Sequence, residues 1–351
     1  QIHYTFHEFT KAEEIFKFIQ ESPLYVDQER IHDARIWLAK TYIAQGNFPE
    51  ALRYLKMLEL DKDNIGSEKE EWKEMSSTQK KRAKERAKKD KKNGVKKPAP
   101  FPKKLEGDYE LAMAEFHIAQ EEYKKAIEHL EKAIELTKKK KRKARYRYVL
   151  AQLYQLTGDG QQASDNFDKV VHSPAPYEMR FQAQINKAIS ATSGGEEIRK
   201  ELGKMLKDPK NLEYKDQIYF ALAEMDMKEG NTDAAKENYS LSAFHSVKND
   251  RQKGQSYLKL GDITFEEKDY LSAQKYYDSC VQVLPEEYEG YDKIKAKADG
   301  LSGLVEHYET YVYEDSVQIK AQMPPDELEK YLKKQLKQML EDEERRKKEE
   351  A

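Results

Sequence analysis

Residues 254–287 read GQSYLKLGDITFEEKDYLSAQKYYDSCVQVLPEE, with small and aromatic side chains at regular places. If residue 254 is numbered as position 1, Gly261 and Ala273 fall at positions 8 and 20, and Tyr270 and Tyr277 fall at positions 17 and 24. Small side chains at positions 8 and 20 let two consecutive helices cross closely, because a large side chain at either place would push them apart. The stretch therefore predicts a helix, a turn and a second helix that pack as a pair.

The same pattern recurs along the chain. It can be placed from residues 32, 107, 144, 216 and 254, and in degenerate form from about 179. The small residues at position 8 are Ala39, Ala114, Ala151, Ala223 and Gly261, and those at position 20 are Ala51, Ala126, Ala163, Ala235 and Ala273. A 34-residue helix-turn-helix unit with this pattern is typical of a tetratricopeptide repeat. The sequence thus predicts an all-α fold, a solenoid of tetratricopeptide repeats.

The departures from the pattern predict the domain organisation. The chain is expected to contain the C-terminal half of a truncated repeat and a linker at 1–31, a repeat at 32–63, a basic disordered insertion at 64–106, four to five repeats over 107–287, capping helices at 288–323 (split into 288–298 and 301–321) and a charged amphipathic helix at 324–351. Because the pattern begins in the middle of a repeat, the natural protein is expected to extend upstream.

Composition and motifs argue against catalysis and against cofactor or metal binding. The 63 basic and 65 acidic side chains leave a net charge of −2, which selects no partner by itself. The single cysteine, Cys280, falls at a packing position, and a lone thiol excludes an internal disulfide framework. No phosphate-binding glycine motif, HExxH or G-x-S-x-G occurs, and no apolar run is long enough to cross a membrane. We therefore expect no enzyme, no cofactor and no metal.

A concave groove is the predicted partner site. Positions 2, 5, 9 and 12 of the first helix in a repeat usually line it, and the candidates there are Tyr148, Gln152, Phe220, Glu224, Met227, Leu258, Asp262 and Phe265. Phe220 and Phe265 are expected to be apolar anchors, and Glu224 and Asp262 to favour a partner that carries Lys or Arg. The alternative that Phe220 and Leu258 are buried layer residues stays open.

A basic patch within the insertion is a second candidate surface. Its residues are Lys80, Lys81, Arg82, Lys84, Arg86, Lys88, Lys89, Lys91 and Lys92. A solvated, mobile segment is one interpretation, and an anionic protein, lipid or glycan surface is another. Nucleic acid is not expected, because no aromatic stacking residues alternate with the basic ones. A second basic run, Lys138 to Lys143, joins two repeats.

Two stretches point to a narrower family. They are Pro176–Met179 with Gln184–Ala188, and Ser193–Glu196 continuing through Asp208-Pro209 and Tyr214–Asp216 to Tyr219–Ala223. Both resemble the PorW or SprE tetratricopeptide lipoproteins of the Bacteroidota, which belong to the type IX secretion and gliding motility machinery.

The resemblance implies a non-enzymatic scaffold at the periplasmic side of the outer membrane. Its partners would be other protein components of that complex, and an upstream lipid anchor would hold it at the membrane. The alternative is a cytoplasmic or nuclear tetratricopeptide adaptor whose basic loop binds nucleic acid or an acidic partner.

Overall fold

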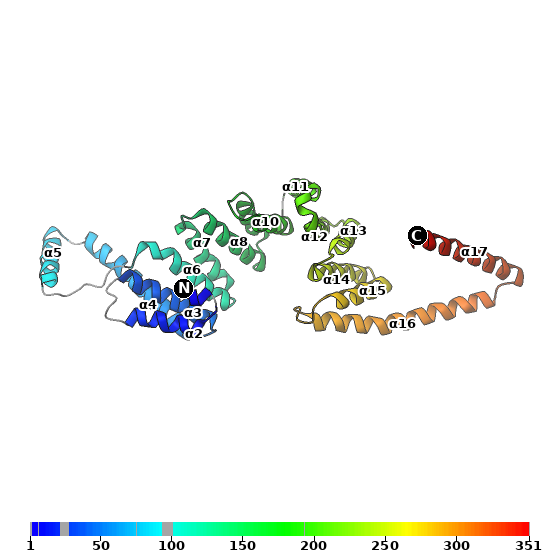
Figure 1. Ribbon diagram of the computed structural model, residues 1–351, viewed down its shortest axis with the longest axis horizontal. Helices are drawn as coiled ribbons and strands as arrows, with labels where there is room; N and C mark the ends of the chain where they lie inside the picture. Colours follow the sequence, from blue (N-terminus) through cyan, green and yellow to red (C-terminus); the bar gives the residue numbers. More distant parts are fainter. Residues whose placement is uncertain are drawn as a thin grey trace. The chain divides into compact units, whose positions relative to one another are not determined.

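The computed structural model describes residues 2–5, 7–21, 28–74, 76–92, 101–192 and 194–350. Throughout these ranges the regular secondary structure is helical. The chain divides into two compact units, Gln1–Lys200 and Glu201–Ala351, and each unit is described by itself (Figure 1).

The first unit is built from helix pairs. Its elements are α1 (Ile2–Thr5), α2 (Phe9–Glu21), α3 (Gln28–Ala44), α4 (Phe48–Glu74), α5 (Ser77–Lys92), the 3₁₀ turn η1 (Lys103–Leu105), α6 (Glu106–Ala119), α7 (Tyr123–Leu136), α8 (Lys140–Leu156), α9 (Gly160–Val171) and α10 (Tyr177–Ser190). Helices α3 and α4, α6 and α7, and α8 and α9 pack as pairs, and α9 also packs against α10. Helix α11 (Gly195–Lys207) contains the boundary between the two units.

The second unit repeats the scheme. Its elements are η2 (Pro209–Tyr214), α12 (Lys215–Lys228), α13 (Thr232–His245), α14 (Asp250–Glu266), α15 (Tyr270–Val283), α16 (Tyr291–Ala321) and α17 (Pro325–Glu350). Helix α12 pairs with α13 and α14 pairs with α15, while α13 packs on α14 and α15 packs on α16. Each helix pair is therefore stacked on the next pair.

The small residues that the sequence places at the crossings are buried. Ala39, Ala51, Ala114, Ala126, Ala151, Ala163, Ala223, Ala235 and Ala273 are all 0% exposed. A Cβ added at Gly261 would lie 3.0 Å from two ring carbons of Tyr277, so no larger side chain fits there without a shift. The predicted all-α solenoid with close helix crossings is confirmed.

Position 15 of the repeat forms the turn between the paired helices. Gly46, Gly158 and Gly230 occupy it with φ between 72° and 82°, a left-handed conformation in which glycine has no Cβ to clash. Glu121 and Lys268 occupy the same position with φ of 58° and 64°. The turn geometry therefore persists where the sequence lacks glycine, because the packing of the two helices imposes it.

The insertion differs from the prediction of a disordered segment over 64–106. Helix α4 continues to Glu74, and residues 77–92 form α5, because Lys, Arg, Ala and Glu favour helix. Beyond them, Phe101 and Leu105 are buried in the core of the first unit, and the Phe101 ring meets the rings of His32 and Tyr109 edge-on at 5.3 and 6.1 Å. Residues 101–106, at the end of the insertion, therefore belong to the fold, while Pro98 and Pro100 lie outside the described residues.

The predicted pair of capping helices at 288–298 and 301–321 is wrong, because α16 runs unbroken from Tyr291 to Ala321. Its buried residues Ile294, Ala298 and Leu301 lie 38 residues after the buried Ser256, Leu260 and Ile263 of α14. The helix therefore packs on α15 as the first helix of one more repeat. One continuous buried stripe spans Gly300, so that glycine does not end the helix.

We expect the substitutions Ala163→Leu and Ala235→Leu each to lower the free energy of unfolding by about 1–3 kcal/mol, because both alanines are fully buried at helix crossings. The matched control is Ala296→Leu, at an exposed position of α16. Thermal unfolding followed by circular dichroism measures the effect. Equal stability of all three variants would contradict the predicted crossings.

We expect Phe101→Ala to destabilise the first unit by about 3–5 kcal/mol, because it leaves a cavity in the core. Replacement of residues 77–92 by a short Gly/Ser linker is expected to cost little, because the described side chains of α5 are mostly exposed. Chemical denaturation compares the two variants. A larger loss from the deletion than from Phe101→Ala would show that α5 packs on the helix pairs.

Candidate interaction surfaces

The predicted apolar anchors of the second unit differ in exposure. Phe220 is half-buried and meets the ring of Tyr239 edge-on at 5.4 Å, and the half-buried Leu258 packs against the cluster around Tyr277. Phe265 is 40% exposed and Met227 is 37% exposed. The structure thus places Phe220 and Leu258 partly inside the helix layers and leaves Phe265 and Met227 open to a partner.

The predicted acidic residues of this groove already have partners in the chain. Glu224 accepts a hydrogen bond from the Tyr239 hydroxyl at 2.7 Å and forms an ion pair with Lys259 at 2.8 Å. Lys259 lies on α14, the first helix of the next repeat. The negative charge of Glu224 therefore ties two layers together, where the sequence suggested attraction of a basic partner.

Asp262 forms the same arrangement 38 residues later. It accepts a hydrogen bond from the Tyr277 hydroxyl at 2.6 Å, and the ammonium group of Lys297 on α16 lies 3.0 Å away. Burial, with the neighbouring Asp262 as a second cause, raises the pKa of Tyr277 to about 12. Burial likewise raises the pKa of Tyr239, with Glu224 as the next cause. Both phenols therefore remain protonated donors at neutral pH.

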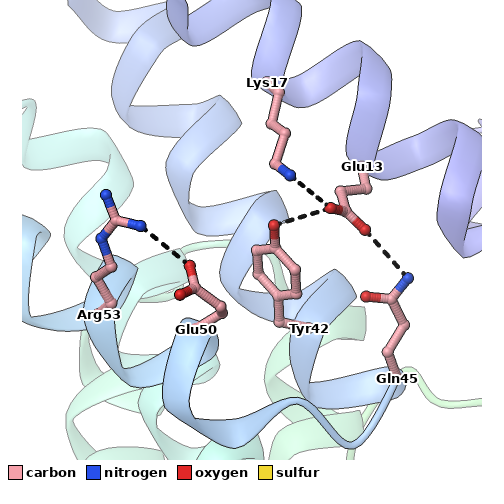
Figure 2. Close-up of polar contacts among 6 residues, drawn as sticks. All are labelled: Glu13, Lys17, Tyr42, Gln45, Glu50 and Arg53. Carbon is pink, nitrogen blue, oxygen red and sulfur yellow. Dashed lines mark hydrogen bonds and ion pairs between the residues drawn. The ribbon is translucent and has the colours of Figure 1, made fainter.

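The first unit contains a similar group between α2 and α3 (Figure 2). Glu13 of α2 accepts from the Lys17 ammonium at 2.7 Å, from the Tyr42 hydroxyl at 2.9 Å and from the Gln45 amide at 3.3 Å. The hydrogen bond from Lys17, followed by those from Tyr42 and Gln45, lowers the pKa of Glu13 against the opposing effect of burial. A carboxylate shared by a tyrosine and a lysine thus joins consecutive helices in both units.

The remaining predicted groove residues, Tyr148 and Gln152, lie on α8 in the first unit. Tyr148 is half-buried, meets Phe167 edge-on at 5.4 Å and accepts a hydrogen bond from the Asn186 amide at 3.2 Å. Burial raises the pKa of its phenol. Gln152 is exposed. Tyr148 therefore contributes mainly to the packing of its own layer.

An apolar pocket in the second unit lies beside Phe265. It has a volume of about 380 Å³ and is lined by Lys268, Asp269, Tyr270, Leu271, Leu304, Val305 and Tyr308. Tyr270 is 38% exposed, Leu304 51% and Tyr308 53%, and the Phe265 ring meets Tyr270 edge-on at 5.6 Å. We call this the α15–α16 pocket. The sequence analysis placed Tyr270 at position 17 of its repeat, and Leu304 and Tyr308 fall within the predicted helix at 301–321. Neither pattern predicted a pocket.

The basic patch is only partly described. The side chains of Lys81, Arg82 and Lys84 on α5 are exposed and that of Lys80 is half-buried. The side chains of Arg86, Lys88, Lys89, Lys91 and Lys92 lie outside the described residues.

Metal and thiol chemistry have little support in the described part of the chain. There, no group of three or more His, Cys, Asp or Glu side chains could hold a metal ion. Cys280 is 0% exposed, and burial raises the pKa of its thiol to about 12, so it is a poor nucleophile. Among the same described residues, no helix combines the length and apolarity needed to span a bilayer.

Comparison with protein families agrees with this geometry. Two family models described as Tetratricopeptide repeat match the chain, over residues 108–171 and 32–55. These are tetratricopeptide repeats. The chain is thus a tetratricopeptide-repeat solenoid, a fold that generally carries protein–protein interactions.

Several solved structures are similar to this tetratricopeptide-repeat chain. The apo form of the quorum sensor NprR from B. thuringiensis is 14% identical, with a TM-score of 0.46, over 88% of this chain and 83% of that one. A signal transduction ATPase of the STAND class with a tetratricopeptide-repeat sensor, from Pyrococcus horikoshii, is 16% identical, with a TM-score of 0.37, over 87% of this chain and 41% of that one. Yeast Tom70 is 16% identical, with a TM-score of 0.31, over 80% and 67%. No curated protein sequence matches the chain.

The two phenylalanines are expected to respond differently to substitution. Phe220→Ser should lower the free energy of unfolding by about 2–4 kcal/mol, because the ring packs on Tyr239. Phe265→Ser, at a more exposed ring, should change it by less than about 1 kcal/mol. Thermal melts of the two single variants make the comparison. Equal destabilisation would place Phe265 in the core as well.

Proposed function

We propose that the chain is a non-enzymatic scaffold that holds a partner protein at the α15–α16 pocket. The observation that carries this proposal is the pocket itself, which gathers exposed apolar and aromatic side chains around a volume of about 380 Å³. A pocket of this size accepts a large apolar side chain from a partner segment. Buried aromatic contacts of this kind supply most of the binding energy at protein interfaces.

The surroundings of the pocket suit a protein ligand. Lys268 and Asp269 lie at its edge, and Phe265 extends the apolar surface beyond it. Lys297 lies over the Phe265 ring at 5.7 Å and is paired with Asp262, so the charges next to this surface are already balanced. A partner segment with an apolar anchor and polar flanks would match this arrangement, since a polar rim excludes water from the anchor.

We further propose that the partner belongs to the type IX secretion and gliding machinery, on the periplasmic side of the outer membrane. The support is the resemblance of residues 176–188 and 193–223 to the PorW or SprE lipoproteins. A lipid anchor upstream of residue 1 would keep the scaffold at the membrane. A signal peptide that ends in a lipobox cysteine, encoded upstream in the full-length gene, would support this localisation, and a gene without one would contradict it.

Crosslinking and mass spectrometry in the native host test both proposals. The variant Leu304→Ser with Tyr308→Ser removes two exposed apolar side chains that line the pocket. The control, Leu332→Ser with Leu336→Ser, removes two similarly exposed apolar side chains of α17 that do not line the pocket. We expect the pocket variant to lose its crosslinked partner and the control to retain it, with both as stable as wild type.

The outcomes test the partner site and the cellular setting separately. Unchanged crosslinks in the pocket variant would refute the α15–α16 pocket as the partner site. A pocket-dependent partner from outside the secretion machinery would refute the cellular setting and leave the scaffold function intact.

A further inference from the structure

A basic groove lies in the first unit and shares no lining residue with the proposed partner site of the second unit. It has a volume of about 680 Å³ and is lined by Lys103, Lys104, Glu106, Gly107, Asp108, Leu136, Thr137, Lys138, Lys139, Arg142 and Tyr146. These residues come from η1, the first turn of α6, the end of α7, the connection between α7 and α8, and the first two turns of α8. We call it the basic groove.

The packing of two helix ends creates this groove. Gly107, in the first turn of α6, lies against Leu136 at the end of α7, and a Cβ at residue 107 would be 3.4 Å from the Leu136 Cβ. This close approach places Lys103 and Lys104 beside the basic run that starts at Lys138. In the sequence the two groups of lysines belong to separate segments, so only the fold combines them.

The groove carries a net positive charge. Five cationic side chains line it against two carboxylates, Glu106 and Asp108. Lys104 is paired with Glu29. Lys103, Lys138, Lys139 and Arg142 are exposed and form no ion pair with the described residues. Like charges held close together repel one another, and an anionic ligand would relieve that repulsion.

The start of helix α8 at the groove adds to this preference. Helix α8 begins after Lys139, whose side chain accepts no capping hydrogen bond, and its first turn carries no acidic residue. At α6 the Glu106 N–H already donates to the Lys103 carbonyl, and Glu106 and Asp108 lie in the first turn. The first backbone N–H groups of a helix need acceptors from outside the helix, and the helix dipole favours negative charge there. Carboxylate oxygens would serve both the lysines and these donors.

We propose that the basic groove binds an acidic peptide segment, in which Asp or Glu residues alternate with apolar ones. The acidic side chains would meet Lys103, Lys138, Lys139 and Arg142. The apolar ones would contact Leu136, which is 43% exposed, and the half-buried Tyr146. The site differs from the α15–α16 pocket in place and in ligand chemistry, so it does not depend on the function proposed above.

The lining favours a peptide over a nucleic acid. A nucleic acid presents a continuous row of phosphates, and the carboxylates of Glu106 and Asp108 in the wall would repel part of such a row. Tyr146 is half-buried, so little of its ring face is free for base stacking. An acidic peptide can place apolar or neutral side chains opposite these two carboxylates.

Fluorescence anisotropy with the full chain tests the proposal. The probe is a labelled peptide of repeating Glu-Leu-Glu, with a Lys-Leu-Lys peptide as the charge control. The groove variant is Lys139→Ala with Arg142→Ala, and the matched control is Lys140→Ala with Lys141→Ala. The control pair is exposed, lies in the same basic run and removes the same charge, but does not line the groove.

We expect the groove variant to weaken binding of the acidic peptide roughly tenfold and the control variant to weaken it by less than about twofold. Binding should also weaken as salt is raised, because the lysines are exposed. The pocket variant Leu304→Ser with Tyr308→Ser should bind the peptide like wild type. Should the groove variant lose helicity, Lys103→Ala with Lys138→Ala provides the same test at two other lining residues outside α8.

Three results would overturn the proposal. Equal weakening by the groove and control variants would show that net charge, and not the groove, attracts the peptide. Binding of single-stranded DNA or of phosphatidylserine vesicles that is tighter than peptide binding and equally sensitive to the groove variant would assign the site to a different polyanion. Absence of peptide binding at low salt would remove the site altogether.

Discussion

The whole structure depends on the close crossing of paired helices at two small side chains. Ala151 with Ala163, and Ala223 with Ala235, bring consecutive helices into contact, and these residues have no exposed surface. Larger side chains there would widen every layer, and the aromatic residues between layers, such as Phe167 and Tyr239, would no longer fill the space. Because each layer contacts mainly its neighbours, one constraint met locally is enough to build an extended solenoid.

Charged side chains form contacts between the helix layers as well as lying on the surface. In the second unit, Glu224 and Asp262 each hold a tyrosine hydroxyl of their own repeat and a lysine of the next. These contacts balance the negative charges of the two acidic residues that the sequence placed in the concave groove. The surface left for a partner there is consequently apolar, around Phe265 and the α15–α16 pocket.

The two units therefore present different chemistry. The second unit offers aromatic and aliphatic side chains around a small pocket, whereas the first offers a cluster of exposed cations. A scaffold with two dissimilar sites can hold two partners, or two segments of one partner, and a weak second contact raises the overall affinity when both sites are engaged together. Non-enzymatic assembly is the common theme of the two proposals.

The helix pairs could be predicted from the sequence, since the spacing of Ala163, Ala235 and Ala273 reports a local contact between helices that follow one another in the chain. The sequence also predicted which first-helix positions of the repeats to inspect, although Phe220 packs against Tyr239 while Phe265 stays more exposed. Phe220 meets Tyr239 of its own repeat, whereas Phe265 lies at the end of α14 beside the turn, and the pattern of small and aromatic positions does not state which of these groove positions is covered.

Other features depend on contacts that the sequence pattern does not record. The tertiary structure buried Phe101 at the end of an insertion that composition marks as disordered, and it placed Lys103 beside Lys138 to form the basic groove. It also joined the start of α15 to α16 and so formed the α15–α16 pocket. Each of these features combines residues from different repeats or from outside the repeats. A periodic pattern records the contacts that recur in every repeat, and contacts made only once leave no period in the sequence.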